Sequence, residues 1–264
     1  MDKKVLRIGI IGGTGVYDPN ILKSVEKLKM HTPYGAPSDF LTKGILDGKE
    51  IIVLPRHGEK HILNPSNVNY LANIWAMKEL GVKRIFSVSA VGSLKEDVKP
   101  GELVFPDQFI DLTKFRKNTF YDGQQVCHVS SAEPFCPEMR KILIETAEEL
   151  SIPYHPKGTC VVIEGPRFSS RAESAVFRSW NADIINMTMF PEVILARESE
   201  ICYANISMVT DYDAWKKHAV ANTDVLKTMK ENIEKVRIIL SKAIPKVREE
   251  RKCVCSSALK DAMM

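Results

Sequence analysis

The side chains best placed to do chemistry in this sequence are two aspartates, Asp211 and Asp213. They follow the apolar run at residues 201–209, whose composition is typical of a buried strand. In extended backbone, residues i and i+2 point to the same side, so both carboxyl groups could hold one ligand that offers two adjacent polar atoms. The edge of a purine, with N7 beside the group on C6, has this form. A solvated turn after a strand explains the same pattern, because Asp is common in turns.

Alternating strands and helices would position these acids. Strands are expected at residues 5–11, 51–54, 84–90, 158–163, 182–187 and 201–209, a further one begins at 103–105, and helices are expected at 66–80, 136–150, 170–180, 191–199 and 223–244. Ser66 is the expected N-cap of the first helix. Because the strands are nearly all apolar, they indicate a largely parallel sheet covered on both faces. The sequence therefore predicts a single α/β domain over residues 1–264, with a mixed, mostly parallel central sheet flanked by helices and a polar C-terminal tail from about residue 246 to 264.

Nearly every expected strand is followed by polar or glycine-rich residues. Ligands of open α/β sheets bind beyond the carboxyl ends of the strands, where such residues gather. We therefore expect one cleft that brings together Gly13-Thr14, Arg56-His57, Ser89-Ala90, Met187-Thr188 and the pair Asp211 and Asp213.

The glycine-rich turn after the first strand does not fit the common nucleotide-binding motifs. Gly13 and Gly15 lack the third glycine of a dinucleotide fingerprint, since Asp18 stands at that position, and no Gly-Lys-Ser/Thr motif occurs. The turn offers backbone N–H groups and the Thr14 hydroxyl, which suit a free phosphate or sulfate. A plain tight turn is the alternative.

Arg56 and His57 add donors for an oxyanion at the end of another strand. Arg can bind an oxyanion through two parallel hydrogen bonds, although an exposed Arg is usually only solvated. His57 and His61 have the spacing of a helical metal pair, but no third ligand lies nearby in the sequence, so no metal is expected. The absence of a Gly-x-Ser-x-Gly motif argues against a serine hydrolase.

Composition narrows the class of protein. Hydrophobic residues make up 44% and charged residues 27%, and the net charge of +4 is dispersed along the chain. This charge is too small and too scattered to predict nucleic-acid binding. No apolar run is long enough to span a membrane, and the N-terminal residues lack the apolar segment of a signal peptide. We therefore expect a cytoplasmic protein that binds a small anionic ligand.

The cysteines fall into two groups. Cys127, Cys136, Cys160 and Cys202 lie in or beside expected core segments, whereas Cys253-Val254-Cys255 lies in the polar tail. A zinc site needs a second pair of ligands, and the tail supplies none. A redox-active or structural disulfide is therefore the expected role of the Cys-x-Cys segment, although disulfides are unusual in cytosolic proteins outside hyperthermophiles.

Taken together, the motifs resemble those of the purine nucleoside phosphorylase family over about residues 6–245, and among its members those that act on 5′-methylthioadenosine. The Cys-x-Cys segment is similar to that of archaeal members. The motifs are Gly12-Gly13-Thr14-Gly15, Pro55-Arg56-His57-Gly58, Asn69-Tyr70-x-Ala72-Asn73, Ser89-Ala90-x-Gly92-Ser93, Glu164-Gly165-Pro166-Arg167-Phe168, Asn186-Met187-Thr188-x-x-Pro191-Glu192 and Thr210-Asp211-Tyr212-Asp213.

The resemblance implies phosphorolysis of 5′-methylthioadenosine to adenine and 5-methylthioribose 1-phosphate, with inorganic phosphate as co-substrate and no cofactor. It also implies a homotrimer or a dimer of trimers, in which His128 is lent to a neighbouring subunit. The pairings considered for disulfides are Cys136 with Cys202 and Cys253 with Cys255. The implied site residues are Thr14, Arg56, His57, Ser89, Ala90 and Thr188 for phosphate, Phe168, Met187, Asp211 and Asp213 for the nucleoside, and His128, Val225 and Leu226 for the methylthio group.

The implied mechanism gives the two acids different roles. A protonated Asp211 would donate to N7 of the leaving base, which requires a raised pKa. Asp213 would accept a hydrogen bond from the 6-amino group and so favour adenine. Residues 219–223 depart from the common pattern near the methylthio pocket. The alternatives are a broader phosphorylase acting on adenosine, inosine or guanosine, and a nucleoside-binding protein without turnover.

Overall fold

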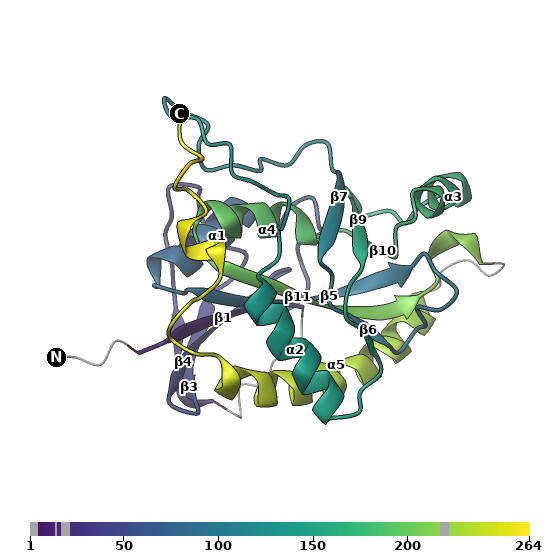
Figure 1. The fold of residues 1–264 in the computed structure, drawn as a ribbon, viewed down its shortest axis with the longest axis horizontal. Coiled ribbons are helices and arrows are strands. Elements are labelled where there is room, and N and C mark those ends of the chain that lie inside the picture. Colours follow the sequence, from purple (N-terminus) through teal and green to yellow (C-terminus); the bar gives the residue numbers. More distant parts are fainter. Residues whose placement is uncertain (1–4, 14, 17–21, 217–221) are drawn as a thin grey trace.

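A mixed sheet with helices on both faces forms the body of the protein (Figure 1). The computed structural model describes residues 5–13, 15–16, 22–216 and 222–264, apart from the side chains of residues 222–225 and 227. The strands are β1 (Arg7–Gly12), β2 (Lys23–Leu28), β3 (Leu41–Leu46), β4 (Lys49–Pro55), β5 (Arg84–Ser93), β6 (Leu103–Val104), β7 (Gln108–Leu112), β8 (Tyr154–His155), β9 (Thr159–Ile163), β10 (Ile184–Asn186) and β11 (Cys202–Asp211).

The sheet has the order β2-β3-β4-β1-β5-β10-β9-β7, with β11, β6 and β8 branching from β5. The pairs β1 with β4, β1 with β5, β5 with β11, β9 with β10, β7 with β9 and β6 with β8 are parallel. The pairs β2 with β3, β3 with β4, β5 with β10 and β6 with β11 are antiparallel. The predicted mixed, mostly parallel sheet is therefore confirmed.

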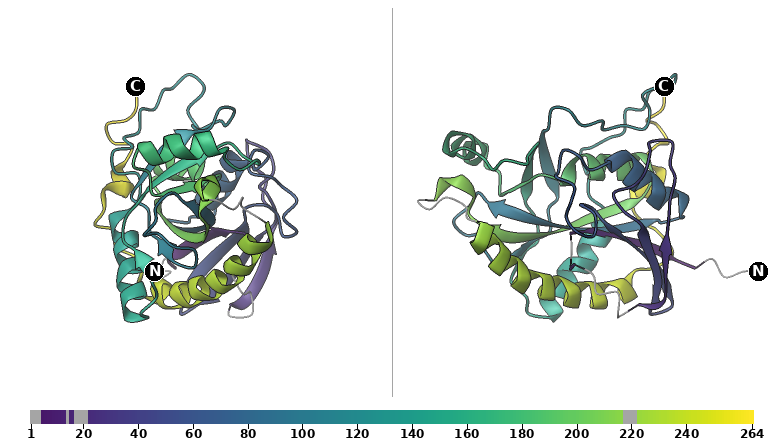
Figure 2. Two further views of the ribbon diagram at one scale, coloured as in Figure 1. Left: turned by 90° about the vertical axis from the view of Figure 1, so that its right-hand side faces the viewer. Right: turned by 180° about the vertical axis from the view of Figure 1, so that it is seen from behind.

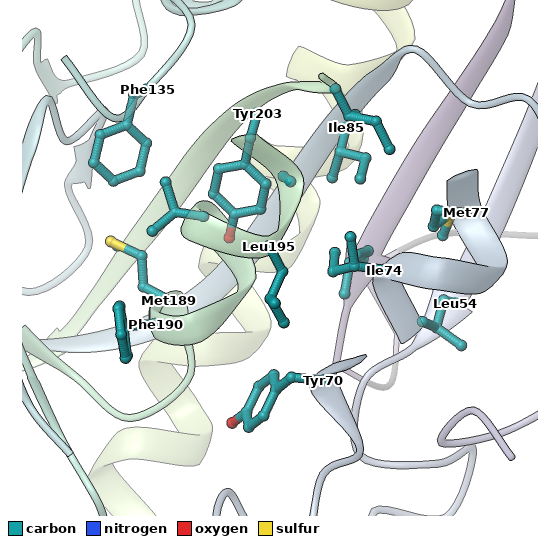
Figure 3. Close-up of a cluster of buried hydrophobic side chains, with 14 of the residues drawn as sticks. Leu54, Tyr70, Ile74, Met77, Ile85, Phe135, Met189, Phe190, Leu195 and Tyr203 are labelled. Carbon is teal, nitrogen blue, oxygen red and sulfur yellow. The ribbon is translucent and has the colours of Figure 1, made fainter. Parts of the chain in front are cut away.

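Two helices cover each face of the sheet, and their apolar sides form separate cores (Figures 1 and 2). The first core lies under α1 (Tyr70–Glu79) and α4 (Met189–Glu198), and Figure 3 shows side chains from both helices meeting those of the sheet. The second core lies under α2 (Pro137–Glu149) and α5 (Asn222–Lys246). The short helix α3 (Arg171–Ser179) packs at one end of the molecule, against the single-turn helix η2 (Asp213–Trp215). Within the described residues, no helix is both long and apolar enough to cross a membrane.

The helix ends follow local sequence signals, with one correction. Ser170 caps α3 in a reciprocal capping box with Glu173, and Pro137 opens α2. The expected cap of α1 at Ser66 is wrong. Asn69 is the cap and accepts a hydrogen bond from the Ala72 N–H at 3.1 Å, because the residues around Ser66 form a separate turn.

The C-terminal segment is ordered against the rest of the protein rather than being a wholly polar tail. It contains the short helix η3 (Val254–Ser257), and Cys253, Cys255 and Ala262 are buried. Its last residues pair with the segment that carries His128, through a hydrogen bond from the His128 N–H to the Ala262 carbonyl at 2.7 Å. Figure 1 shows the yellow C-terminal end beside the teal loop of this segment.

Candidate active site

A cavity of about 520 Å³ lies at the carboxyl ends of β1, β4, β5, β10 and β11. It gathers most of the residues that the sequence analysis placed in one cleft. The side chain of Val225 and all of Thr14 lie outside the described part of the chain, and His128 is not among the described residues that line the cavity. The predicted residues that do line it are Gly13, Arg56, His57, Ser89, Ala90, Phe168, Met187, Thr188, Asp211, Asp213 and Leu226.

Arg56 is buried at one wall and paired with a carboxylate that sequence reasoning did not assign to it. Its Nε and Nη2 atoms donate to the two carboxyl oxygens of Glu192 at 2.5 and 3.0 Å. Its other contacts are the Val88 carbonyl at 2.8 Å and the Ser87 hydroxyl at 2.7 Å. Burial alone would lower the pKa of Arg56, but the Glu192 carboxylate raises it above its ordinary value. The guanidinium group is thus a fixed, charge-compensated part of the wall.

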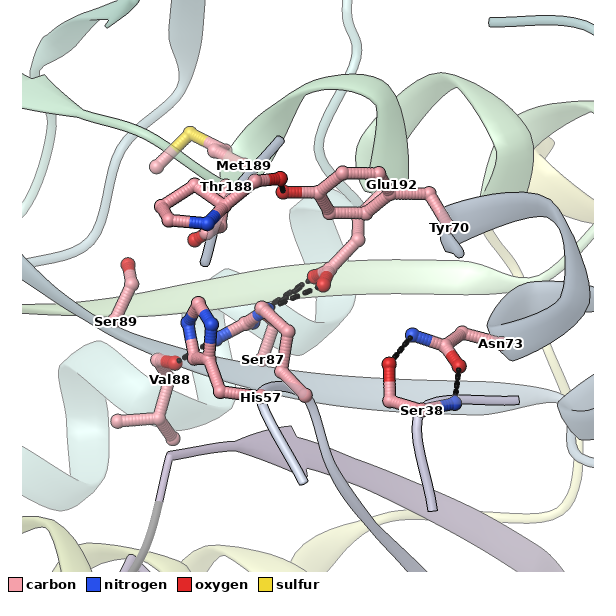
Figure 4. Close-up of polar contacts among 12 residues, drawn as sticks. Ser38, His57, Tyr70, Asn73, Ser87, Val88, Ser89, Thr188, Met189 and Glu192 are labelled. Carbon is pink, nitrogen blue, oxygen red and sulfur yellow. Dashed lines mark hydrogen bonds and ion pairs between the residues drawn. The ribbon is translucent and has the colours of Figure 1, made fainter. Parts of the chain in front are cut away.

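Glu192 is held from several sides and is fully buried. Besides Arg56, it accepts hydrogen bonds from the Tyr203 hydroxyl at 2.9 Å and the Ser87 hydroxyl at 3.0 Å. Figure 4 shows its carboxyl group with His57, Ser89 and Thr188 to one side. The Pro-Glu dipeptide at residues 191–192 was the only signal in the sequence for this acid.

His57 is held in one tautomer beside the ion pair. Its Nδ1 lies 2.8 Å from the Leu63 carbonyl oxygen, so this nitrogen carries the hydrogen and Nε2 has a free lone pair. Burial and the neighbouring Arg56 charge lower the pKa of His57 to about 4. His57 is therefore neutral at pH 7 and presents a hydrogen-bond acceptor from Nε2.

Hydroxyl and backbone groups complete this wall. The Ser89 hydroxyl makes one long hydrogen bond, 3.3 Å, to Asn205. Asn186 accepts from the backbone N–H of Thr188 at 2.7 Å and so fixes the turn into α4. Ala90 is the one exposed residue of β5, which opens the backbone of the strand to the cavity. The Ser89 hydroxyl can turn away from this long hydrogen bond to donate to an oxyanion.

The two aspartates line the same cavity, but not in the extended geometry expected from their spacing. The register between β5 and β11 shifts after Val209, so Thr210 is an extra residue that bulges the strand. Asp213 then has a φ of +47° and begins η2. Its N–H donates to Asp211 Oδ1 at 2.8 Å. The acids are therefore brought together by a bulge and a turn.

The environments of the two carboxyl groups differ. Burial raises the pKa of Asp211, and the charge of Asp213 adds to this rise. Hydrogen bonds from the Thr210 hydroxyl and the Asp213 N–H oppose the rise but do not cancel it. Asp213 is 4% exposed, and its Oδ2 has no hydrogen-bond partner among the described residues. A buried acceptor without a partner is costly, so this oxygen calls for a donor from a ligand.

Glycine is required where two segments approach the site closely. A Cβ on Gly92 would lie 3.0 Å from Asp211 Oδ1 and 3.3 Å from Asp213 Cβ. Gly165 has a φ of +67°, and a Cβ there would lie 2.6 Å from the Met187 sulfur. Both glycines therefore set the shape of the cavity.

Apolar side chains line the rest of the cavity. Phe168 is 45% exposed and Leu226 is 54% exposed at its open edge. Such large exposed apolar residues at a cleft are suited to stack on or enclose a ligand.

All six cysteines are free thiols, so the disulfides considered from the sequence are not found. The C-terminal segment folds back so that Cys253 and Cys255 lie beside both Cys136 and Cys202, and the four sulfurs form one cluster instead of two separate pairs.

Comparison with known proteins gives a consistent set of relatives. The model of the Phosphorylase superfamily matches residues 7–245. S-methyl-5′-thioadenosine phosphorylase of Pyrococcus abyssi is 58% identical over 254 residues, covering 96% of this chain and 98% of the relative. Methylthioadenosine phosphorylase from Schistosoma mansoni, solved in complex with adenine, is 41% identical with a TM-score of 0.91, covering 97% of this chain and 96% of that one. A mutant adenosine/methylthioadenosine phosphorylase from the same organism, solved with methylthioadenosine, is 42% identical with the same TM-score and coverage.

Proposed function

Because this chain belongs to the Phosphorylase superfamily, we propose that it cleaves 5′-methylthioadenosine with inorganic phosphate, giving adenine and 5-methylthioribose 1-phosphate. The observation that carries the proposal is the acid pair, in which Asp211 has a raised pKa and Asp213 has a buried oxygen without a partner. These two groups match the needs of adenine, which accepts a proton at N7 and donates hydrogen bonds from its 6-amino group.

Phosphate would occupy the wall of Arg56, His57, Ser89 and Thr188, with the backbone N–H of Ala90 contributing. Thr14, which lies outside the described residues, is expected to join this set. Glu192 already accepts hydrogen bonds from Nε and Nη2 of Arg56. Arg56 therefore offers phosphate a remaining oriented N–H and a nearby positive charge, not a pair of parallel hydrogen bonds. The Nε2 lone pair of His57 requires a partner that carries a hydrogen. A phosphate oxygen that is protonated, or that transfers its proton to His57 on binding, satisfies this requirement.

Phosphate and Asp211 would together promote cleavage of the glycosidic bond. Breaking the bond between C1′ and N9 leaves positive charge on the ribose and negative charge on the purine. Phosphate stabilises the ribose cation and attacks C1′ from the opposite face, with inversion. Asp211, in its protonated form, donates to N7 and neutralises the departing base, and its raised pKa supports this form. Burial strengthens both effects.

Base selection would rest on Asp213. An unpaired buried carboxylate oxygen accepts from the 6-amino group of adenine but repels the O6 atom of hypoxanthine or guanine. Met187, held by Gly165, would pack against the ribose, and Phe168 would stack on the base.

We also propose that the site is completed by a second copy of the chain in a homotrimer or a dimer of trimers. The exposed Phe168 and Leu226 at the cavity edge support a covering surface there. His128, whose segment is fixed by the C-terminal end, would reach the methylthio group of a neighbouring subunit together with that subunit's own Val225 and Leu226. Light scattering at micromolar concentration tests the assembly, and a stable monomer with full activity would contradict it.

Adenine release is the direct test of the reaction. The purified protein should release adenine from methylthioadenosine only when phosphate is added, and faster than it cleaves adenosine or inosine. Asp211→Asn, which cannot donate an acidic proton, should lower kcat/KM for methylthioadenosine by far more than tenfold. Binding without phosphate-dependent cleavage would identify a nucleoside-binding protein, and faster cleavage of inosine would identify a 6-oxopurine phosphorylase.

A further inference from the structure

His128 lies on a long loop that contains no helix or strand. The loop spans residues 113–136, all of which the structure describes, between the end of β7 and the start of α2. Loops of this length without secondary structure are usually functional or disordered. Figure 1 shows the loop in teal on the side of the molecule that carries α1 and α4. His128 is exposed on this loop, so the contacts of the loop backbone decide where its imidazole lies.

Arg197, in the last turn of α4, holds the loop on the C-terminal side of His128. Its Nε donates to the Ser130 carbonyl at 2.6 Å, and its Nη1 donates to the Glu133 carbonyl at 2.8 Å. Arg197 is only 6% exposed. Because the donors of a guanidinium group have a fixed planar geometry, this one side chain fixes two peptide groups of the loop relative to α4.

Glu198, the next residue, holds the loop on the N-terminal side of His128. Its two carboxyl oxygens accept hydrogen bonds from the Thr119 hydroxyl at 2.7 Å and from the Phe120 N–H at 2.8 Å. Glu198 is 2% exposed. Burial raises its pKa, and these two hydrogen bonds oppose the rise. Two consecutive buried residues of α4 thus spend their charged side chains on the two ends of the segment that carries His128.

Helix α4 gives both anchors a fixed base. All of its residues except Ile194 are buried, and it packs against α1 and β11. Near its other end it carries Glu192, which holds Arg56 in the wall of the cavity. Close-packed interiors resist shifts of single elements, so the loop is held in a fixed position relative to the rest of the subunit.

We propose that Arg197 and Glu198 are positioning residues, which hold the loop so that His128 enters the methylthio pocket of a neighbouring subunit. This inference rests on the proposed reaction and the proposed trimer. Neither residue would touch the substrate. Losing either anchor would leave the loop free to move away from the pocket, and the methylthio group would lose its apolar enclosure. The 5′-hydroxyl of adenosine would be affected less, because water can replace its lost contacts.

Comparing two substrates tests the role of the anchors. Arg197→Met, which keeps an extended side chain but removes both donors, should raise KM for methylthioadenosine about tenfold and change KM for adenosine less than about twofold. Glu198→Leu, which removes both acceptors, should do the same. The matched control is Arg140→Met, because Arg140 also donates to two backbone carbonyls outside this loop, those of Phe105 at 3.3 Å and Pro156 at 2.5 Å. Both KM values of the control should equal those of the wild type.

Mixed trimers show whether Arg197 acts on its own subunit or on the neighbour. When Arg197→Met and Asp211→Asn chains are co-expressed, some sites combine the intact Asp211 of one chain with the His128 loop of a chain whose Arg197 is intact. The mixed trimers, isolated through a different tag on each chain, should therefore regain the wild-type KM for methylthioadenosine, which neither variant shows alone.

The inference is overturned if the mixed trimers keep the raised KM. It is also overturned if Arg197→Met raises KM equally for both substrates, or for neither. If this variant does not fold, Arg197→Lys, which keeps one donor group, should still show a smaller rise in KM for methylthioadenosine alone. A wild-type protein that releases no adenine from methylthioadenosine and phosphate, or that is a monomer, would instead refute the proposed reaction or assembly, and the inference with it.

Discussion

Neutralising Glu192 should destabilise the fold more than any exposed Glu→Gln change. In Glu192→Gln the shape is kept, but the amide can place only one oxygen toward Arg56 and must turn N–H groups toward its donors. Arg56 keeps the Val88 carbonyl and the Ser87 hydroxyl and becomes a buried cation without a counter-charge. Removing one partner of a buried ion pair costs roughly 3–5 kcal/mol.

The loss of stability in Glu192→Gln can be measured as a decrease in melting temperature. An unfolding entropy of about 2.1 cal/mol/K per residue, over 264 residues, amounts to about 0.55 kcal/mol/K, so the loss corresponds to roughly 5–9 °C in phosphate-free buffer. Phosphate should restore part of this, because it supplies an anion beside Arg56 and binds only the folded chain. The matched control is Glu145→Gln, whose exposed pair with Lys141 should be worth about 0.5 kcal/mol or less.

Calorimetry of the two variants with and without phosphate would decide the matter. If Glu192→Gln melts within about 2 °C of the wild type, or if phosphate stabilises it no more than the wild type, then the account of the ion pair as the charge balance of this wall is wrong.

Three further predictions concern the cavity. Gly92→Ala places a Cβ 3.0 Å from Asp211 Oδ1 and should lower kcat/KM for methylthioadenosine by on the order of tenfold or more. The control is Gly123→Ala, whose added Cβ meets no atom within 4 Å and should leave kcat/KM unchanged. Equal rates for both variants would contradict the role of Gly92. Asp213→Asn should raise the ratio of inosine to methylthioadenosine turnover, because an amide can donate to O6, and an unchanged ratio would remove Asp213 from base selection. The pKa of His57 is about 4 in the folded protein and near 6.5 in the unfolded chain, so between these values the unfolded chain binds more protons. The free energy of unfolding should therefore fall by up to about 3 kcal/mol as the pH drops through this window. A His57→Asn variant should show a flatter dependence of melting temperature on pH, and curves parallel to those of the wild type would refute the assignment.

The fold was largely predictable because its central strands are continuous apolar runs. The runs at residues 84–90 and 201–209 became β5 and β11, and their carboxyl ends do converge on one cavity. The strands β2 and β7 were missed because they are exposed or half-buried edge strands, with lysine, glutamate and aspartate in place of an apolar pattern.

The gathering of strand-end residues around one cavity was predictable from the sequence, but the contacts within the cavity were not. Side-chain types at strand ends pointed to Arg56 and Asp211, whereas the partner of Arg56 lies far along the chain, where no local spacing reveals it. The turn at Asp213 depends on a bulge that only the register between two strands defines. The cysteine cluster was missed for the same reason, since it forms only when the C-terminal segment returns to the start of α2.

Strand β5 contacts β1, β10 and β11, so releasing it requires three ladders to separate. Its backbone amides should therefore exchange with solvent deuterium only through global unfolding, more slowly than those of any edge strand. Ser89, Ala90 and Gly92 lie on this strand. If the cleft closes around a ligand, the side that carries Phe168 and Leu226 must therefore move, while β5 stays in place.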